Sequence, residues 1–349
     1  MKIVLLEPLG IPAEVLAQYQ ARLEAQGHSM VCYETQTTDP AELLRRTGDS
    51  DIAILANTPY PASVVEGASQ LKLLDVAFTG VDHVALEACR AKGVTVCNAA
   101  GYSTQCVAEL ALGLTIACLR QLPACEAAAR SGGAGTPFRG REIAGRTVGI
   151  VGTGAIGTRT AQLFQAFGAR VIAYSRTRRP EVERLGVTYV SLEELLQQSD
   201  IVSLHVPSNG ETKGLLSRQR LAMMKPSAIL INVARGAIVD NVALAEALNQ
   251  GQLAGAGIDV FDQEPPLPPE TPLLHAKNAV LTPHVAFATE ESMLRRAEIV
   301  FHNIDAFFGG KARECVPVSE GTPVRIQQRP VLRVECPEDW ALHFVVYGP

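Results

Sequence analysis

Three side chains in the second half of the sequence, Arg235, Glu264 and His284, could together bind an acid and move a proton. They follow, in that order, the short apolar segments 228–233, 257–260 and 279–281. A guanidinium binds a carboxylate, an imidazole donates a proton, and a carboxylate beside the imidazole favours its protonated form. Any one of them alone is more often a solvated charge or a turn residue. Because the carboxyl ends of parallel strands meet at one edge of a sheet, we expect all three on one rim.

A glycine-rich turn precedes this triplet and indicates a binding site for a dinucleotide. The apolar run 147–151 leads into Gly152-Thr153-Gly154-Ala155-Ile156-Gly157, and a helical segment follows. Gly152 permits the tight turn, Gly154 lets a pyrophosphate approach the backbone, and Gly157 lets the helix pack on the strand. The first N–H groups of that helix, which include those of Ala155 and Ile156, would hold the phosphates.

The next strand is followed by residues that favour NADP(H) over NAD(H) as the cofactor. A site that prefers NAD has Asp or Glu about 20 residues after the glycines. This chain has Ser175 there, and the following residues are Arg176, Thr177, Arg178 and Arg179. A guanidinium therefore stands where a 2′-phosphate would lie. NAD(H) is the alternative cofactor, and in that case the arginines form a solvated basic turn.

Short runs rich in β-branched residues alternate with helical segments in two successive units, which predicts an α/β fold. The predicted strands of the first unit are 2–6, 51–56, 73–77 and 94–97. Those of the second unit are 147–151, 170–174, 200–206, 228–233, 257–260 and 279–281. Such continuous apolar runs are typical of parallel sheets with helices on both faces. We predict two doubly wound parallel-sheet domains, a flavodoxin-like discontinuous substrate domain and a Rossmann dinucleotide-binding domain.

The amphipathic stretch 289–308 follows the last strand of the second unit, and we expect it to return to the first. This places a substrate-binding domain at residues 1–102 and 288–315 and an NAD(P)-binding domain at 103–287. Two crossings would then form a hinge, with a cleft between the domains. Residues 316–349 contain five prolines, which argue against helix. We treat them as a C-terminal tail of unassigned structure.

The composition describes an ordinary globular protein and disfavours several classes of function. The 349 residues carry a net charge of −5 without clustered Lys and Arg, so we expect no nucleic acid partner. We also expect no membrane partner, because no apolar run is long enough to cross a bilayer. The N-terminus turns polar by Glu7, which predicts a cytoplasmic location. The histidines lack metal-ligand spacing, so we expect no metal, and we interpret Cys106 as a small core residue rather than a reactive thiol.

Five successive motifs of this sequence resemble those of the D-2-hydroxyacid dehydrogenase family. They are 152–157, 205–207, 232–240, 258–265 and 281–284, and the resemblance extends from Lys2 to about Lys311. It implies that Arg235 binds the substrate carboxylate, that His284 is the acid in reduction, and that Glu264 pairs with His284. The implied reaction is hydride transfer between NAD(P)H and a small 2-keto acid of the glyoxylate, hydroxypyruvate or pyruvate type, giving the D-2-hydroxy acid.

The same resemblance assigns further binding groups and a homodimer built around 103–138. In the loop 78–83, the N–H groups of Thr79 and Gly80 would receive the substrate carboxylate, and Asp259 would hold the nicotinamide carboxamide. Further implied cofactor contacts are His205, Val206, Pro207, Val233, Ala234 and His284. Many members have Gly-Ser where this chain has Ala286-Phe287, a departure that bears on substrate identity more than on reaction type.

A dinucleotide-sensing regulatory protein is the alternative from a different functional class. The resemblance includes transcriptional corepressors that keep the fold, the cofactor and the three catalytic positions. Absence of turnover over a broad panel of keto acids would favour that alternative. A formate dehydrogenase-like activity is disfavoured, because those relatives have Gln where this chain has Glu264.

Overall fold

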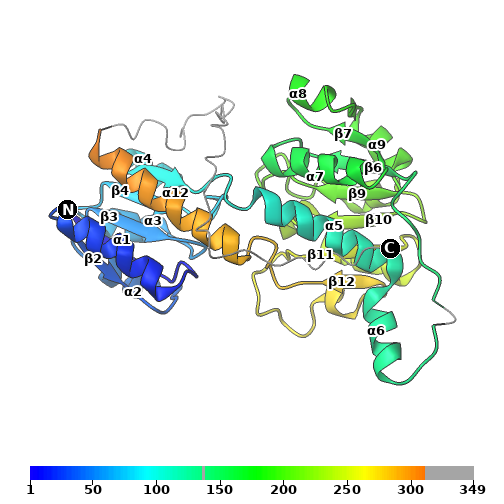
Figure 1. The fold of residues 1–349 in the computed structure, drawn as a ribbon, viewed down its shortest axis with the longest axis horizontal. Coiled ribbons are helices and arrows are strands. Elements are labelled where there is room, and N and C mark those ends of the chain that lie inside the picture. Colours follow the sequence, from blue (N-terminus) through cyan, green and yellow to red (C-terminus); the bar gives the residue numbers. More distant parts are fainter. Residues whose placement is uncertain (136–137, 311–349) are drawn as a thin grey trace, which may run out of the picture.

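The computed structural model describes residues 1–135 and 138–310, so the tail 316–349 and the end of the predicted segment 288–315 lie outside the described residues. Two α/β domains lie side by side (Figure 1). The elements of the first are β1 (Lys2–Leu5), α1 (Ala13–Ala25), β2 (Ser29–Cys32), α2 (Pro40–Thr47), β3 (Ile52–Leu55), α3 (Ala62–Gly67), β4 (Leu73–Val76), α4 (Leu86–Lys92), β5 (Thr95–Asn98) and α12 (Glu290–Phe308).

The second domain begins with α5 (Thr104–Arg120) and continues to the end of β12. Its other elements are α6 (Leu122–Arg130), β6 (Thr147–Val151), α7 (Ala155–Ala166), β7 (Arg170–Tyr174), α8 (Pro180–Glu183), β8 (Thr188–Tyr189), α9 (Leu192–Gln198), β9 (Ile201–Leu204), α10 (Arg218–Leu221), β10 (Ile229–Asn232), the 3₁₀ turn η1 (Gly236–Ile238), α11 (Asn241–Asn249), β11 (Gly255–Ile258), the 3₁₀ turn η2 (Pro272–His275) and β12 (Ala279–Leu281).

Both sheets are fully parallel and doubly wound. The first has the order β2-β1-β3-β4-β5, which is the flavodoxin-like arrangement, and the second has the order β12-β11-β10-β9-β6-β7-β8. In the second sheet the order reverses between β6 and β9, as in a Rossmann domain. Every residue of β3 and β4 is buried, because helices cover both faces. The predicted fold class is thus confirmed, while the edge strands β2 and β8 were missed.

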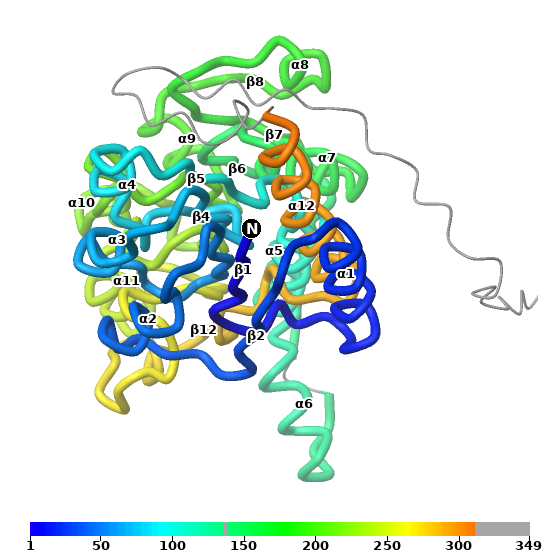
Figure 2. Tube along the Cα trace, turned by 90° about the vertical axis from the view of Figure 1, so that its left-hand side faces the viewer, coloured from blue at the N-terminus to red at the C-terminus, as the bar shows by residue number. Residues whose placement is uncertain are grey.

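Helix α12 returns from the second domain and packs on the first sheet, where Figures 1 and 2 show it beside α1. Its buried residues, Ala297, Val300, Phe301 and Ile304, belong to the same hydrophobic core as β1, β3 and β4. Phe301 stacks on Tyr19 of α1 with ring centroids 3.9 Å apart. The Thr289 side chain accepts a hydrogen bond from the Ser292 N–H and caps the helix.

The two chain crossings between the domains lie against each other. Arg295 donates a hydrogen bond from Nε to the carbonyl of Tyr102, 3.1 Å away, which ties the second crossing to the first. Cys106 is buried at the start of α5, and its thiol donates to the Ser103 carbonyl over 3.3 Å. Burial raises the pKa of this thiol, so Cys106 is a packed, protonated side chain.

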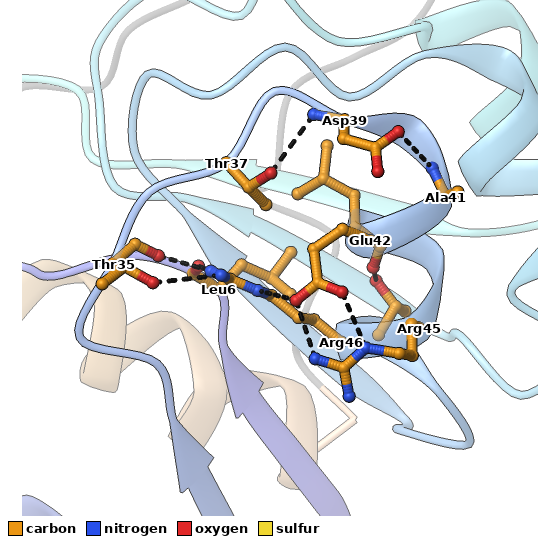
Figure 3. Close-up of polar contacts among 10 residues, drawn as sticks. Leu6, Thr35, Thr37, Asp39, Ala41, Glu42, Arg45 and Arg46 are labelled. Atoms are coloured by element: carbon orange, nitrogen blue, oxygen red, sulfur yellow. Dashed lines mark hydrogen bonds and ion pairs between the residues drawn. The ribbon is translucent and has the colours of Figure 1, made fainter.

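Polar contacts of α2 fix the loop that follows β2 at the carboxyl edge of the first sheet (Figure 3). Asp39 caps the helix through the Ala41 N–H. Arg46 donates to the carbonyls of Leu6 and Thr35, and its Nε donates to Glu42 over 2.9 Å. The guanidiniums of Arg45 and Arg46 lower the pKa of Glu42 to about 2. The end of β1 and the loop after β2 are therefore held together by charge-assisted hydrogen bonds.

Helix α6 extends away from the body of the second domain (Figures 1 and 2) and contains no buried residue. No single helix among the described residues is long and apolar enough to cross a membrane. The pair α5 and α6 would satisfy that test only together, with a bend of 61° between them.

Candidate active site

His284 and Glu264, which come from two different loops, form a short hydrogen bond. His284 Nδ1 lies 2.6 Å from Glu264 Oε2, and the histidine side chain is 9% exposed. Burial raises the pKa of Glu264, but the hydrogen bond and charge of His284 outweigh it, so the net shift is downward. Glu264 is therefore a carboxylate at neutral pH and accepts a hydrogen bond from His284 Nδ1.

The backbone of His284 adopts the left-handed region, with φ of 55°, which non-glycine residues rarely occupy. The buried carboxylate of Asp259 holds this turn. It accepts hydrogen bonds from the Thr282 hydroxyl at 2.5 Å and from the N–H groups of Val285 and Ala286, each at 2.9 Å. The His284 N–H also donates to the Asp259 carbonyl over 2.8 Å. Burial raises the pKa of Asp259, with these hydrogen bonds opposing it. The residue expected to hold the carboxamide thus also fixes the position of the imidazole.

Arg235 extends from the second domain to the loop 78–83 of the first domain, which is the loop expected to bind the substrate carboxylate. Its Nη2 lies 3.3 Å from Asp82 Oδ1, and its Nε lies 3.4 Å from Oδ2. Burial raises the pKa of Asp82, but the charge of Arg235 outweighs it and lowers the pKa overall. A Cβ on Gly80 would lie 2.0 Å from Arg235 Nη2, so only glycine leaves room for the guanidinium at this point of the loop.

A side-chain amide and a close backbone approach fix the loop that carries Arg235. The buried amide of Asn232 donates to the Arg235 carbonyl over 3.0 Å and accepts from the Ala234 N–H over 3.1 Å. A Cβ on Gly236 would lie 1.9 Å from the carbonyl carbon of Phe261, so the loop passes directly against the loop that carries Glu264. These close contacts bring Arg235 and the His284–Glu264 pair to the same edge of the sheet.

Phe78 stands between the catalytic candidates. Its ring lies edge-on to His284, at 6.0 Å between centroids, and to Phe287, at 5.0 Å. The Arg235 guanidinium carbon lies 5.8 Å from the Phe78 centroid. Phe287 also meets His284 edge-on at 5.5 Å. The rings of Phe78 and Phe287 therefore lie beside the imidazole, and the Arg235 guanidinium lies over the ring of Phe78.

Of the two residues expected to receive the substrate carboxylate, Gly80 lies next to the Arg235 side chain, and Thr79 precedes it in the loop. Thr79 is exposed, and its carbonyl accepts a hydrogen bond from the Asn98 amide at 2.7 Å. Asn98 ends β5, and its own carbonyl accepts from Asn303 of α12 at 3.2 Å. The loop is thus connected to the helix that follows the second crossing.

The glycine-rich turn after β6 has the shape that a dinucleotide pyrophosphate requires. Gly152 has φ of 96°, and a Cβ there would lie 2.6 Å from the His205 carbonyl oxygen. A Cβ on Gly157 would lie 1.9 Å from the Gly152 carbonyl oxygen. A Cβ on Gly154, in contrast, would meet no atom within 4 Å. Within the described part of the chain, no side chain caps the N-terminus of α7. The residues present therefore fit a phosphate at this helix terminus.

The remaining expected cofactor residues surround this turn. Ser175 is half-buried after β7, and Arg176, Thr177 and Arg178 are exposed. His205 follows β9, where its Nε2 lies 2.8 Å from the Ser203 hydroxyl. Burial lowers the pKa of His205 to about 3, so its ring is neutral. Val206 and Pro207 continue from it, while Val233 and Ala234 lie in the loop before Arg235.

Sequence reasoning missed Asp82, Asn98 and Glu211 as residues of the site. Asp82 lies within the recognised loop motif, but nothing in its position predicts a pair with a residue of the other domain. Glu211 pairs with Arg176 across the glycine turn, over 35 residues of sequence. For metal binding, the described residues include no group of three or more His, Cys, Asp or Glu that could hold an ion.

Comparison with known proteins gives a consistent result. The model of the family "D-isomer specific 2-hydroxyacid dehydrogenase, NAD binding domain" matches residues 112–286. A glyoxylate reductase of Korarchaeum cryptofilum is 40% identical over 276 residues, which cover 77% of this chain and 83% of the relative. An acyclic imino acid reductase solved with NADPH and D-Arg superposes with a TM-score of 0.82 at 29% identity, covering 90% of this chain and 100% of the other. D-lactate dehydrogenase from Aquifex aeolicus, solved with NAD and lactic acid, gives 0.78 at 28% identity, covering 89% and 96%.

Proposed function

Since the chain belongs to the D-isomer specific 2-hydroxyacid dehydrogenase family, we propose that it reduces a small 2-keto acid to the D-2-hydroxy acid, with NADPH preferred over NADH. The family comparisons support a 2-keto acid reductase that uses a nicotinamide dinucleotide. The observation that carries the proposal is the meeting of the His284–Glu264 pair, Arg235 and the substrate loop around Phe78.

In the proposed reaction Arg235 binds the substrate carboxylate with the N–H groups of Thr79 and Gly80. A reduced nicotinamide dinucleotide, when bound at the glycine turn 152–157, would supply the hydride that the keto carbon accepts. His284 donates its Nε2 proton to the carbonyl oxygen, because Nδ1 is engaged with Glu264. Glu264 stabilises the protonated imidazole before transfer, and the ring is reprotonated from solvent afterwards. In the oxidative direction the neutral imidazole accepts the hydroxyl proton.

The aromatic residues beside His284 favour a small side chain on the substrate. Phe78 is 4% exposed and Phe287 is half-buried against it, and both rings stand nearly perpendicular to the imidazole, with centroids 6.0 and 5.5 Å from it. A side chain on the keto carbon would extend into this region if the carboxylate is bound by Arg235. Glyoxylate, hydroxypyruvate and pyruvate fit this restriction better than branched or aromatic keto acids. A single methylene changes discrimination by about 1–3 kcal/mol.

The preference for NADPH rests on the turn after β7. Ser175 supplies no carboxylate to the ribose hydroxyls, and the exposed Arg176 and Arg178 stand where a 2′-phosphate would be bound. A charge-assisted hydrogen bond contributes roughly 1.5–3 kcal/mol, which corresponds to a preference of about 10- to 100-fold.

A panel of keto acids assayed with both cofactors tests this function. We expect turnover of at least one two- or three-carbon keto acid, with a higher kcat/KM for NADPH than for NADH. Exchanging Ser175→Asp and Arg176→Ala together should reverse the cofactor preference. Lack of turnover across the panel would contradict the enzyme and favour the regulatory alternative. Equal kcat/KM values for both cofactors would contradict the NADP preference alone.

We further propose that the protein forms a homodimer through α5 and α6. The projecting helix α6, whose residues are all at least partly exposed, supports this proposal. Light scattering on the purified protein should give twice the 37.3 kDa chain mass. A monomer mass would contradict it. The cytoplasmic location expected from the sequence stays a prediction.

A further inference from the structure

We propose that Glu211 sets the cofactor preference by competing with the 2′-phosphate of NADP for Arg176. This inference rests on the proposed function, in which Arg176 recognises that phosphate. The Arg176 guanidinium donates a hydrogen bond from Nη1 to Glu211 Oε2. In the structure, therefore, the guanidinium that the 2′-phosphate would need is already paired with a carboxylate of the same chain.

The ion pair lies across the dinucleotide site, because its partners follow the two strands that flank β6. Arg176 follows β7 and Glu211 follows β9, and the strand order reverses between β6 and β9. Open α/β sheets bind ligands at this reversal. The Gly152 N–H donates to the Tyr174 carbonyl over 2.7 Å, and a Cβ on Gly152 would touch the His205 carbonyl. The ends of β7 and β9 thus lie on either side of the glycine turn, and the pair connects them.

Glu211 is presented on a turn whose own hydrogen bonds fix it. The Asn209 side chain accepts from the N–H of Glu211 at 2.9 Å and from that of Thr212 at 3.2 Å. The Thr212 hydroxyl donates to the Pro207 carbonyl over 2.6 Å. Because this turn directly follows the 205–207 motif, the position of Glu211 relative to the cofactor site is set by the backbone.

The neighbouring arginines have partners on their own side of the site. Arg178 lies over the Tyr189 ring at 5.9 Å, and Arg179 pairs with Glu181 at 3.6 Å. Among the residues that the structure describes, Arg176 is the one of these three arginines that contacts a carboxylate from beyond the glycine turn. Both side chains of the Arg176–Glu211 pair are 68% exposed, and exposed ion pairs contribute little stability. A phosphate dianion can therefore displace the carboxylate, at the cost of leaving Glu211 unpaired beside it.

Calorimetric titration with NADP⁺ and NAD⁺, which differ only in the 2′-phosphate, tests the competition without an activity assay. Loss of an exposed pair changes a dissociation constant by up to about fivefold. In Glu211→Gln we expect NADP⁺ to bind about three- to fivefold more tightly and NAD⁺ to bind within twofold of wild type. The matched control is Glu181→Gln, which removes a carboxylate of α8 from a different arginine, Arg179, and should leave both constants unchanged.

The double variant Arg176→Ala with Glu211→Gln shows whether Glu211 acts by pairing with Arg176 or only by repelling the phosphate with its negative charge. If Glu211 acts through Arg176, adding Glu211→Gln to Arg176→Ala should not change NADP⁺ affinity further. An unchanged NADP⁺ affinity in Glu211→Gln overturns the inference, and so does equal tightening of both dinucleotides or an equal effect of Glu181→Gln. Failure of the proposed NADP preference gives a different result, namely equal affinities of the wild type for NADP⁺ and NAD⁺, and can therefore be told apart from failure of this inference.

Discussion

Replacing Gly80 by alanine should damage catalysis while leaving the fold intact. The new Cβ would lie 2.0 Å from Arg235 Nη2, 2.8 Å from Asp82 Oδ1 and 3.2 Å from Arg235 Cζ. The backbone of Gly80 does not lie in the left-handed region, so alanine introduces no backbone strain there. The atoms in its way are the far ends of two flexible side chains, which can swing aside at little cost in stability.

The expected loss follows from how far the guanidinium must move. A methyl carbon needs roughly 3.4 Å to a neighbouring nitrogen, so Arg235 Nη2 must shift by about 1.4 Å from its present 2.0 Å. Misplacement of a substrate-positioning group by about 1 Å can cost 10²-fold in rate. We therefore expect kcat/KM for the keto acid to fall about 100-fold, equivalent to roughly 2.7 kcal/mol.

Steady-state kinetics, calorimetry and thermal unfolding together identify the cause. In Gly80→Ala the melting temperature and the dissociation constant of NADP⁺ should stay at wild-type values. Gly309→Ala is the control, because a Cβ there meets only backbone oxygens at 3.6 Å, at the end of α12. A kcat/KM within threefold of wild type in Gly80→Ala would refute the argument that Arg235 is held in its working position.

Three further predictions concern the histidine pair and a buried carboxyl. His284→Ala should lower kcat by roughly 10²–10⁴-fold with little change in NADP⁺ affinity, and a near-normal kcat would exclude general acid catalysis by His284. Glu264→Gln should move the alkaline limb of the reductive pH profile to lower pH, because the neutral amide no longer favours imidazolium; an unmoved limb would argue against the pair. Burial raises the pKa of Asp75 to about 7, opposed by a hydrogen bond from Asn303. Since this folded-state pKa exceeds the unfolded value, ionisation destabilises the fold increasingly from about pH 4 to pH 7, by up to roughly 4 kcal/mol. Asp75→Asn should therefore gain stability over wild type across that range in urea unfolding, and a pH-independent difference would contradict it.

The fold was predictable where strands are buried on both faces. The runs at 147–151 and 170–174 were placed at the bounds that the structure has, because continuous apolar segments between turn residues have few alternatives. The missed strands β2 and β8 are edge strands, the first alternating in burial and the second two residues long. Neither pattern differs from that of a loop.

Strand β11 was shifted by two residues for a packing reason that a single sequence does not reveal. We expected 257–260, whereas β11 is Gly255–Ile258. A Cβ on Gly257 would lie 2.8 Å from Leu114 Cβ, so this strand needs glycine to let α5 approach. Glycine is a poor strand former, and the prediction therefore favoured the apolar residues that follow it.

The candidate site was predictable in its residue types and in the pair of Glu264 with His284, but not in its contacts between the two domains. The strand-end positions of Arg235 and His284 follow from the topology of a parallel sheet. The contacts of Asp82 with Arg235 and of Phe78 with His284 depend on how two domains close on each other. A left-handed backbone at His284 could not be expected either, because histidine has no intrinsic need for it.

Arg235 and Arg176, the two arginines proposed to bind the substrate carboxylate and the 2′-phosphate, are each paired with a carboxylate of the chain itself. The geometry of the two pairs explains how a ligand can replace that carboxylate. The contacts of Arg235 with Asp82, at 3.3 and 3.4 Å, are longer than the 2.7–2.9 Å typical of charge-assisted hydrogen bonds. Arg176 and Glu211 are in close contact but largely exposed to water, which weakens their attraction. Each pair keeps the guanidinium near its working position, yet neither is strong enough to exclude a bound carboxylate or phosphate. An arginine side chain that is already held in place loses less conformational entropy when the ligand binds, so less binding free energy is needed to offset that loss. Weak pairing with Asp82 therefore serves substrate binding better than a fully buried ion pair would, whereas the pair of Arg176 with Glu211 lowers the affinity for a 2′-phosphate without excluding it.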